Sequence, residues 1–149
     1  MVTYDANDKI LNTGNGFFIS EKGVAISDYA LFKNAQRAVI ITSEGEKMPV
    51  KAILGANDMY DVVKFSVDIT SKKVANLTLS ETPMTEGTKL WLLPYSTQKV
   101  RSLTSGNVNS VDKISDYAYY TINLPLKEKM VSCPLMNDEG VVVALAQKA

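Results

Sequence analysis

The sequence predicts an all-β protein arranged as a sandwich or as barrels. Short stretches of β-forming residues follow one another closely, and turn-forming residues separate them. The only helix-like piece, Tyr29 to Arg37, is at most about two turns long. Together, the short strands, the frequent turns and the scarcity of helical periodicity favour antiparallel sheets over any helical or mixed fold.

The first half of the chain contains several predicted strands joined by tight turns. Gly23 lies in one of these turns, and Gly45 is available for a positive φ in a hairpin turn over 43–46. Pro49 stands near the start of a strand, where a missing N–H costs least. Val63, Phe65 and Val67 alternate onto one face of their strand. The predicted strands of this half are 17–20, 24–27, 39–42, 48–54 and 61–67.

The second half repeats this style after a polar stretch, 68–85, which we interpret as the connection between two β halves. Residues 100–111 are predicted as two short strands separated by an irregularity at Gly106. Trp91 is predicted to lie in the core of this half. The other predicted strands are 89–94, 118–122, 134–136 and 141–143.

Composition excludes several classes of function. The 149 residues include 16 basic and 16 acidic side chains, and this zero net charge does not favour a nucleic-acid groove. The chain has no histidine, so no catalytic triad that needs one can form within it. The single cysteine, Cys133, excludes an internal disulfide and a cysteine-cluster metal site. The longest apolar runs are too short to span a bilayer, and the N-terminus is not a signal peptide.

Five segments, in order, resemble the trypsin/chymotrypsin-like serine proteases, especially their bacterial HtrA-type branch. They are Gly14 to Ser20, Gly23 to Ala35, Val50 to Val67, Leu103 to Asn109 and Val131 to Val142. The resemblance implies two packed antiparallel six-stranded β-barrels. We therefore expect a first barrel over residues 1–70, a connection over 71–85 and a second barrel over 86–149, the whole being one module of a larger protein.

The same resemblance implies that the catalytic residues are degenerate. Ala30 stands at the position of the family's histidine, and Val131 stands at the position of its nucleophile. Lys129 and Ser132 replace two glycines around that nucleophile, in a loop that supplies oxyanion-stabilising N–H groups. Asp61 matches the family's aspartate, which orients an imidazole that this chain lacks. Alternatively, Asp61 is a turn carboxylate bonded to nearby backbone.

Ser132 and Cys133 are the two other candidate nucleophiles, and each has a simpler structural interpretation. Ser132 could act with a lysine such as Lys129, but its offset from Pro134 differs from the family pattern, and such a lysine needs burial to lose its proton. Cys133 could mimic viral cysteine proteases of this fold, but its spacing also fails and no base is available. We expect Cys133 to be a small buried core residue.

The aromatic cluster Tyr117, Tyr119 and Tyr120 has two interpretations. Tyrosine is frequent at binding hot spots, which suggests a recognition surface. Packing of a β-strand with alternate rings buried explains the same pattern. The loop residues Lys129, Met130, Ser132 and Cys133 are retained as candidate binding residues.

The sequence therefore predicts a catalytically inactive trypsin-like protease homologue, serving as a protein- or peptide-binding or scaffold module of a larger bacterial protein. An extended peptide could add to an edge strand in the cleft between the barrels. No cofactor, metal, nucleic acid or membrane insertion is expected, and the resemblance implies a periplasmic or cell-envelope setting. The alternatives are an active serine hydrolase with a non-standard site and a purely structural spacer.

Overall fold

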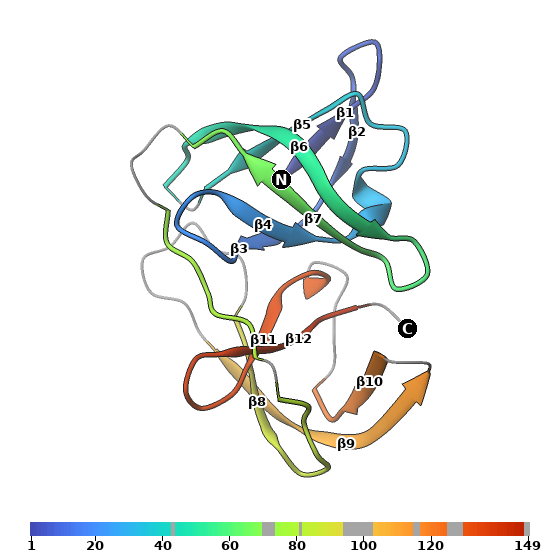
Figure 1. Ribbon diagram of the computed structural model, residues 1–149, viewed down its shortest axis with the longest axis vertical. Coiled ribbons are helices and arrows are strands. Elements are labelled where there is room, and N and C mark those ends of the chain that lie inside the picture. The colour runs from blue at the N-terminus through green and yellow to red at the C-terminus, as the bar shows by residue number, and fades with distance from the viewer. Residues whose placement is uncertain are drawn as a thin grey trace.

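Two curled antiparallel sheets, one from each half of the chain, make up the protein (Figure 1). The structure is a computed structural model that describes residues 1–42, 44–69, 74–80, 82–93, 103–114, 117–124 and 130–147. The helix that these ranges contain in full is the short 3-10 turn η1, Tyr29–Leu31. No helix in the described part of the chain is long and apolar enough to cross a membrane.

The first sheet has seven strands in the order β2-β1-β5-β6-β7-β4-β3, every neighbouring pair being antiparallel. The alternation predicted for β7 is confirmed, because Val63, Phe65 and Val67 are all buried. The strands are β1 (Val2–Tyr4), β2 (Ile10–Thr13), β3 (Gly16–Phe18), β4 (Val24–Ser27), β5 (Arg37–Ile41), β6 (Lys47–Asn57) and β7 (Val62–Val67).

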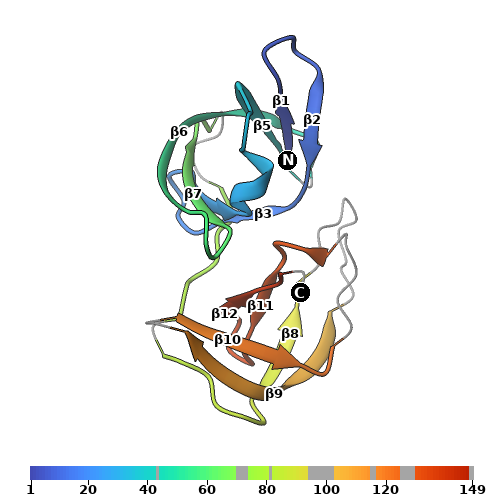
Figure 2. The ribbon, with the colours of Figure 1, turned by 90° about the vertical axis from the view of Figure 1, so that its right-hand side faces the viewer.

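The long strand β6 curls the first sheet. Its start pairs with β5, and its remainder pairs with β7. The register with β7 shifts twice, between Val50 and Ala52 and between Ile53 and Gly55. Such bulges bend a strand and increase its twist. The sheet accordingly closes toward a ring in the view of Figure 2.

The second sheet has five strands in the order β10-β9-β8-β11-β12, again all antiparallel. In the described residues the two sheets thus have seven and five strands, where six were expected in each. The strands are β8 (Lys89–Leu92), β9 (Thr104–Ile114), β10 (Tyr117–Ile122), β11 (Pro134–Met136) and β12 (Val142–Leu145).

Each half has its own apolar core. In the first half, five buried residues pack together: Ala25, Met48, Val63, Phe65 and Val67. The second half has two clusters, one around Leu92, Leu124, Cys133, Leu135 and Ala146 and one around Met84, Leu90 and Val108. Cys133 is therefore the buried core residue that the sequence predicts.

Residues 74–80 contact both sheets as the chain passes from one half to the other (Figure 1). The Leu77 N–H donates to the Phe18 carbonyl at the edge of the first sheet, at 2.9 Å. Leu79 and Val142 form an isolated parallel bridge on the other side, where the Ser80 N–H donates to the Val142 carbonyl at 2.7 Å. The connection is thus bonded to both halves.

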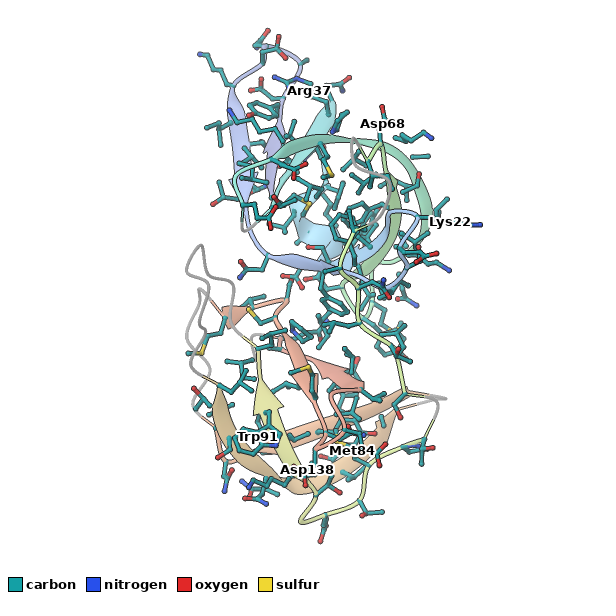
Figure 3. All side chains as sticks on the ribbon, turned by 90° about the vertical axis from the view of Figure 1, so that its left-hand side faces the viewer. Lys22, Arg37, Asp68, Met84, Trp91 and Asp138 are labelled. Atoms are coloured by element: carbon teal, nitrogen blue, oxygen red, sulfur yellow. The ribbon has the colours of Figure 1, made fainter. Side chains whose placement is uncertain are left out.

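Three details differ from the sequence-based expectations. β1 and β2 form an additional N-terminal hairpin that the sequence did not indicate. β9 is one continuous strand through Gly106, because a glycine here permits the close approach of Asn123 and Leu124. Trp91 is only half-buried and donates from Nε1 to Asp138 at 2.7 Å (Figure 3), because the alternation of β8 sends Leu90 and Leu92 into the core instead.

Candidate functional site

Asp28 and η1 follow directly after β4 and supply one wall of the candidate site. Asp28 is extended, with φ −74° and ψ 132°, and precedes the 3-10 turn that contains Ala30. The Ala30 N–H donates to Asp61 Oδ1 at 2.6 Å, and the Tyr29 N–H donates to the Asp61 carbonyl at 3.3 Å. The 3-10 turn is thereby fastened to the loop between β6 and β7.

That β6–β7 loop places Asp61 in an uncommon backbone conformation. Its φ is +54°, a left-handed conformation that aspartate tolerates better than most residues. The Tyr60 N–H donates to Asn57 Oδ1 at 3.1 Å, which forms an Asx turn just before it. Asp58 in the same loop forms a salt bridge with Lys33. The loop geometry therefore turns Asp61 toward the Ala30 N–H.

The segment before β11 supplies the opposite wall. Ser132 is fully buried and has a φ of +69°, a value that glycine adopts most readily. Its N–H donates to the Ala146 carbonyl at 2.8 Å. The Val131 carbonyl accepts from Asn15 Nδ2 at 3.1 Å, and this bond joins the two halves of the chain. Although serine stands where the family pattern has glycine, the backbone at this residue keeps a glycine-like conformation.

Asp28 and Ser132 face each other from opposite halves. The Asp28 side chain is buried, and this burial raises the pKa of its carboxyl, the nearby Ser132 hydroxyl lowers it and the charge of Asp61 raises it further. Within the described residues, Asp28 Oδ1 and Ser132 Oγ are both buried and neither reaches hydrogen-bond geometry with a partner. A buried carboxyl oxygen and a buried hydroxyl without partners are costly features.

Asp28 lines a cavity of about 290 Å³ to which both halves of the chain contribute residues. Tyr60 and Tyr119, from different halves, form a tilted ring pair with centroids 5.7 Å apart. Gln147 Nε2 donates to the Tyr60 carbonyl at 2.6 Å and closes another side. We call this space the acidic cavity, and its lining residues are Asp28, Met59, Tyr60, Asp61, Tyr119, Val131 and Gln147.

A larger cavity of about 460 Å³ lies beside β3, the edge strand of the first sheet. Its lining is mainly apolar and includes Phe17, Phe18, Ile40 and Met48 from the first half. Leu93, Cys133 and Pro134 reach it from the second half, and residues 74–77 line another side. We call this space the edge cavity.

The structure places most of the residues singled out from the sequence near these two cavities. Asp61 and Val131 line the acidic cavity, and Ala30 is bonded to Asp61. Met130 packs against a core of the second half, Ser132 is buried, and Cys133 lines the edge cavity. Lys129 lies outside the described residues.

Tyr119 and Tyr120 have different surroundings. Tyr119 lines the acidic cavity, whereas the Tyr120 hydroxyl accepts from the Met84 N–H at 3.1 Å and its ring packs on a core cluster. The side chain of Tyr117 lies outside the described part. Strand packing therefore explains Tyr120, while Tyr119 is placed at a cavity.

Sequence reasoning missed Asp28, Tyr60 and Gln147 as lining residues of the acidic cavity. A carboxylate directly after a predicted buried strand was a usable signal for Asp28, because strand ends commonly carry site residues. Nothing local distinguished Gln147, which reaches the cavity only through its bond to the Tyr60 carbonyl, 87 residues earlier.

Two antiparallel half-barrels with a site between them define the class of trypsin-like double-barrel proteins. The model of the trypsin-like peptidase domain family matches residues 14–145. The chain therefore belongs to the trypsin-like peptidase domain family. A comparison with curated proteins gave no significant match.

Proposed function

We propose that this chain is a catalytically inactive trypsin-like protease homologue that serves as a protein- or peptide-binding or scaffold module of a larger bacterial protein. The observation that carries the proposal is the environment of Asp61. Its carboxylate accepts the backbone N–H of Ala30, whose methyl side chain offers no general base. Val131 on the other side of the acidic cavity offers no nucleophile.

The nearest hydroxyl on this segment does not compensate for these losses. Ser132 is fully buried, so its Oγ is not accessible to a substrate carbonyl. Its neighbour Asp28 has a raised pKa, but a carboxyl beside a hydroxyl that no substrate carbonyl can reach does not produce an attacking nucleophile. A base, a nucleophile and an oxyanion hole act together in this class of enzyme, so partial activity is not expected.

The test of inactivity is incubation with a fluorophosphonate probe followed by intact-mass measurement. The expected result is no adduct, with an active trypsin as the positive control. A stoichiometric adduct on Ser132 would contradict the proposal and favour the serine hydrolase with a non-standard site.

The binding role is supported by the edge cavity. β3 ends the first sheet, and an extended peptide pairs with such an edge through backbone hydrogen bonds while apolar side chains enter neighbouring pockets. The edge cavity offers such a pocket beside Gly16–Phe18. The Phe18 carbonyl is already bonded to Leu77, so the pairing would use the earlier part of the strand.

A peptide array followed by fluorescence anisotropy tests this role. Ala75 is exposed and lines the edge cavity, so Ala75→Trp is expected to fill the pocket and abolish binding of selected peptides. The matched control is Ala52→Trp, because Ala52 is exposed on β6 and does not line either cavity. If no peptide binds the unmodified chain, the structural spacer becomes the better interpretation.

A further inference from the structure

The acidic cavity carries an imbalance of charge. Asp28 and Asp61 both line it; burial is the main cause of the raised pKa of Asp28, the Ser132 hydroxyl lowers that pKa, and the charge of Asp61 adds a smaller rise. In the described part of the chain, the cation that interacts with Asp61 is Lys33, which is already paired with Asp58. Among the described residues that line the cavity, none is a cation.

Asp28 gives an independent indication of a missing partner. The residue is 7% exposed, and within the described residues no donor reaches Oδ1 in hydrogen-bond geometry, although the Ser132 hydroxyl is close enough to lower the pKa of this carboxyl. Buried carboxylates are normally paired or hydrogen-bonded, because an isolated buried charge is strongly unfavourable. A bound donor at this position would satisfy the group.

The other residues that line the acidic cavity indicate which kind of hydrogen-bond donor would bind there. The Tyr60 and Tyr119 rings, with centroids 5.7 Å apart, present aromatic surface to the cavity, and Met59 and Val131 add apolar surface. A guanidinium group is planar, weakly hydrated and able to donate to two carboxylates while stacking on an aromatic ring. A strongly hydrated ammonium or metal ion would lose more hydration in such a site.

We propose that the acidic cavity binds a guanidinium group, held by the carboxylates of Asp28 and Asp61 and stacked against Tyr60 or Tyr119. The cavity volume of about 290 Å³ accommodates the end of an arginine side chain. This proposal rests on the proposed function where the guanidinium belongs to a bound peptide, and it then adds an arginine preference to that function. A free guanidinium compound is the other source of the same chemistry.

The first experiment is a titration of the full chain with methylguanidinium chloride, followed by ¹H–¹⁵N and aromatic NMR at constant ionic strength. So small a ligand is expected to bind in the millimolar range. We expect saturable shifts confined to Tyr60, Tyr119 and Val131. Methylammonium and calcium chloride are the comparison ligands, and equal or tighter binding of either at the same residues would overturn the assignment to guanidinium.

Matched variants test the role of the carboxylates. Asp28→Asn and Asp61→Asn are each expected to weaken methylguanidinium binding about tenfold or more, since a hydrogen bond between charged groups is lost. Asp68→Asn is the control, because Asp68 is exposed on the first half (Figure 3) and does not line the cavity. Amide spectra verify that each variant is folded. Unchanged binding in both cavity variants would overturn the proposal.

Peptides that differ at a single arginine distinguish the two sources and separate this proposal from the proposed function. Tighter binding of the arginine peptide than of its lysine or citrulline counterpart, lost in Asp28→Asn, supports a peptide source. Methylguanidinium binding without peptide binding supports the cavity site but contradicts the peptide-binding role. If peptides bind equally well with and without the arginine, and methylguanidinium does not bind, the cavity site is overturned. The proposed peptide-binding role is then still supported.

Discussion

At the scale of single residues, Asp28 is one of two residues in the described part of the chain whose buried side-chain oxygen has no hydrogen-bond partner. Its buried Oδ1 has no partner there, and its charge is opposed by that of Asp61. Natural proteins tolerate unfavourable buried polar groups where a functional site requires them. Substitutions that remove such groups then raise the free energy of unfolding. The acidic cavity is thus expected to be a place where stability and ligand binding conflict.

The first prediction is that Asp28→Asn stabilises the protein at neutral pH by about 1 kcal/mol. The asparagine amide has no charge to desolvate, and its N–H can donate to the nearby Ser132 Oγ. Because the pKa of Asp28 in the folded chain lies above its ordinary value of 3.8, the folded state keeps its proton over a pH window in which the unfolded chain has lost it. The contribution of Asp28 to stability is therefore greatest below that window and falls as pH rises through it.

Urea unfolding of the wild type and Asp28→Asn across this pH range measures the effect. The difference in the free energy of unfolding between them is expected to grow from acidic to neutral pH. Asp68→Asn, at an exposed carboxylate, is the control for a change in net charge. A variant less stable than the wild type at neutral pH would show that the charged form of Asp28 is stabilising.

At the scale of an element, the segment before β11 determines the second prediction. Ser132 has a φ of +69°, which disfavours residues with a Cβ, and its buried hydroxyl has no partner in the described residues. Ser132→Ala removes the hydroxyl but keeps the backbone cost. Ser132→Gly removes both, and it is expected to be more stable than Ser132→Ala by roughly 0.5–1 kcal/mol.

Thermal and urea unfolding of the two Ser132 variants, measured side by side, isolate the backbone effect. The gain is limited because glycine also increases the entropy of the unfolded chain. Equal stability of the two variants would contradict the prediction, because the cost of the left-handed conformation would then be no larger than the entropic cost of glycine.

Strand β9 determines the third prediction. A Cβ at Gly106 would lie 2.9 Å from Asn123 Oδ1 and 3.0 Å from Leu124 Cβ. Asn123 cannot simply move, since its Oδ1 accepts from the Asn107 N–H at 2.6 Å. Gly106→Ala is therefore expected to destabilise the protein by about 1–3 kcal/mol through overpacking.

Gly55 provides the matched control for that substitution. It lies in strand β6, and a Cβ there meets no atom within 4 Å among the described neighbours. Gly55→Ala is expected to be neutral or to stabilise by about 0.4–1 kcal/mol. Chemical denaturation of both variants checks the contrast, and similar losses of stability in the two would contradict the explanation by close packing.

At the scale of the whole molecule, the fourth prediction concerns restoring catalysis across the two halves. Ala30→His combined with Val131→Ser would place an imidazole beside Asp61 and a hydroxyl across the acidic cavity. We predict no turnover from this double variant. Lys129 and Ser132 still replace glycines in the loop, and loss of one oxyanion donor alone costs about 100- to 1,000-fold in rate.

A casein or small-ester assay of the double variant and of the quadruple variant with Lys129→Gly and Ser132→Gly measures this. The added glycines are expected to matter as much as the restored side chains, because misplacement of about 1 Å can cost about 100-fold. Robust turnover by the double variant would show that the loop already presents its N–H groups in a catalytic arrangement, as the glycine-like φ of Ser132 would permit.

Sequence patterning predicted the local structure well where a short-range signal existed. The alternation of Val63, Phe65 and Val67 matches their burial, and Gly45 has the expected positive φ, +86°. Sequence patterning failed to predict a strand where pairing with another strand determines the local structure. Val2–Tyr4 forms a strand because it pairs with both β2 and β5, and the latter pairing is not encoded locally.

The sequence by itself determined the all-β class, the family resemblance and the lack of any histidine, because each depends only on residue identity and spacing along the chain. Only the tertiary structure decided that Asp28 meets Ser132, that Tyr60 meets Tyr119 and that Gln147 bonds to the Tyr60 carbonyl. These contacts join residues from opposite halves of the chain, and they exist because two separately curled sheets pack their loops together. The charge and burial of the acidic cavity follow from that packing, which residue patterns along a single strand cannot specify.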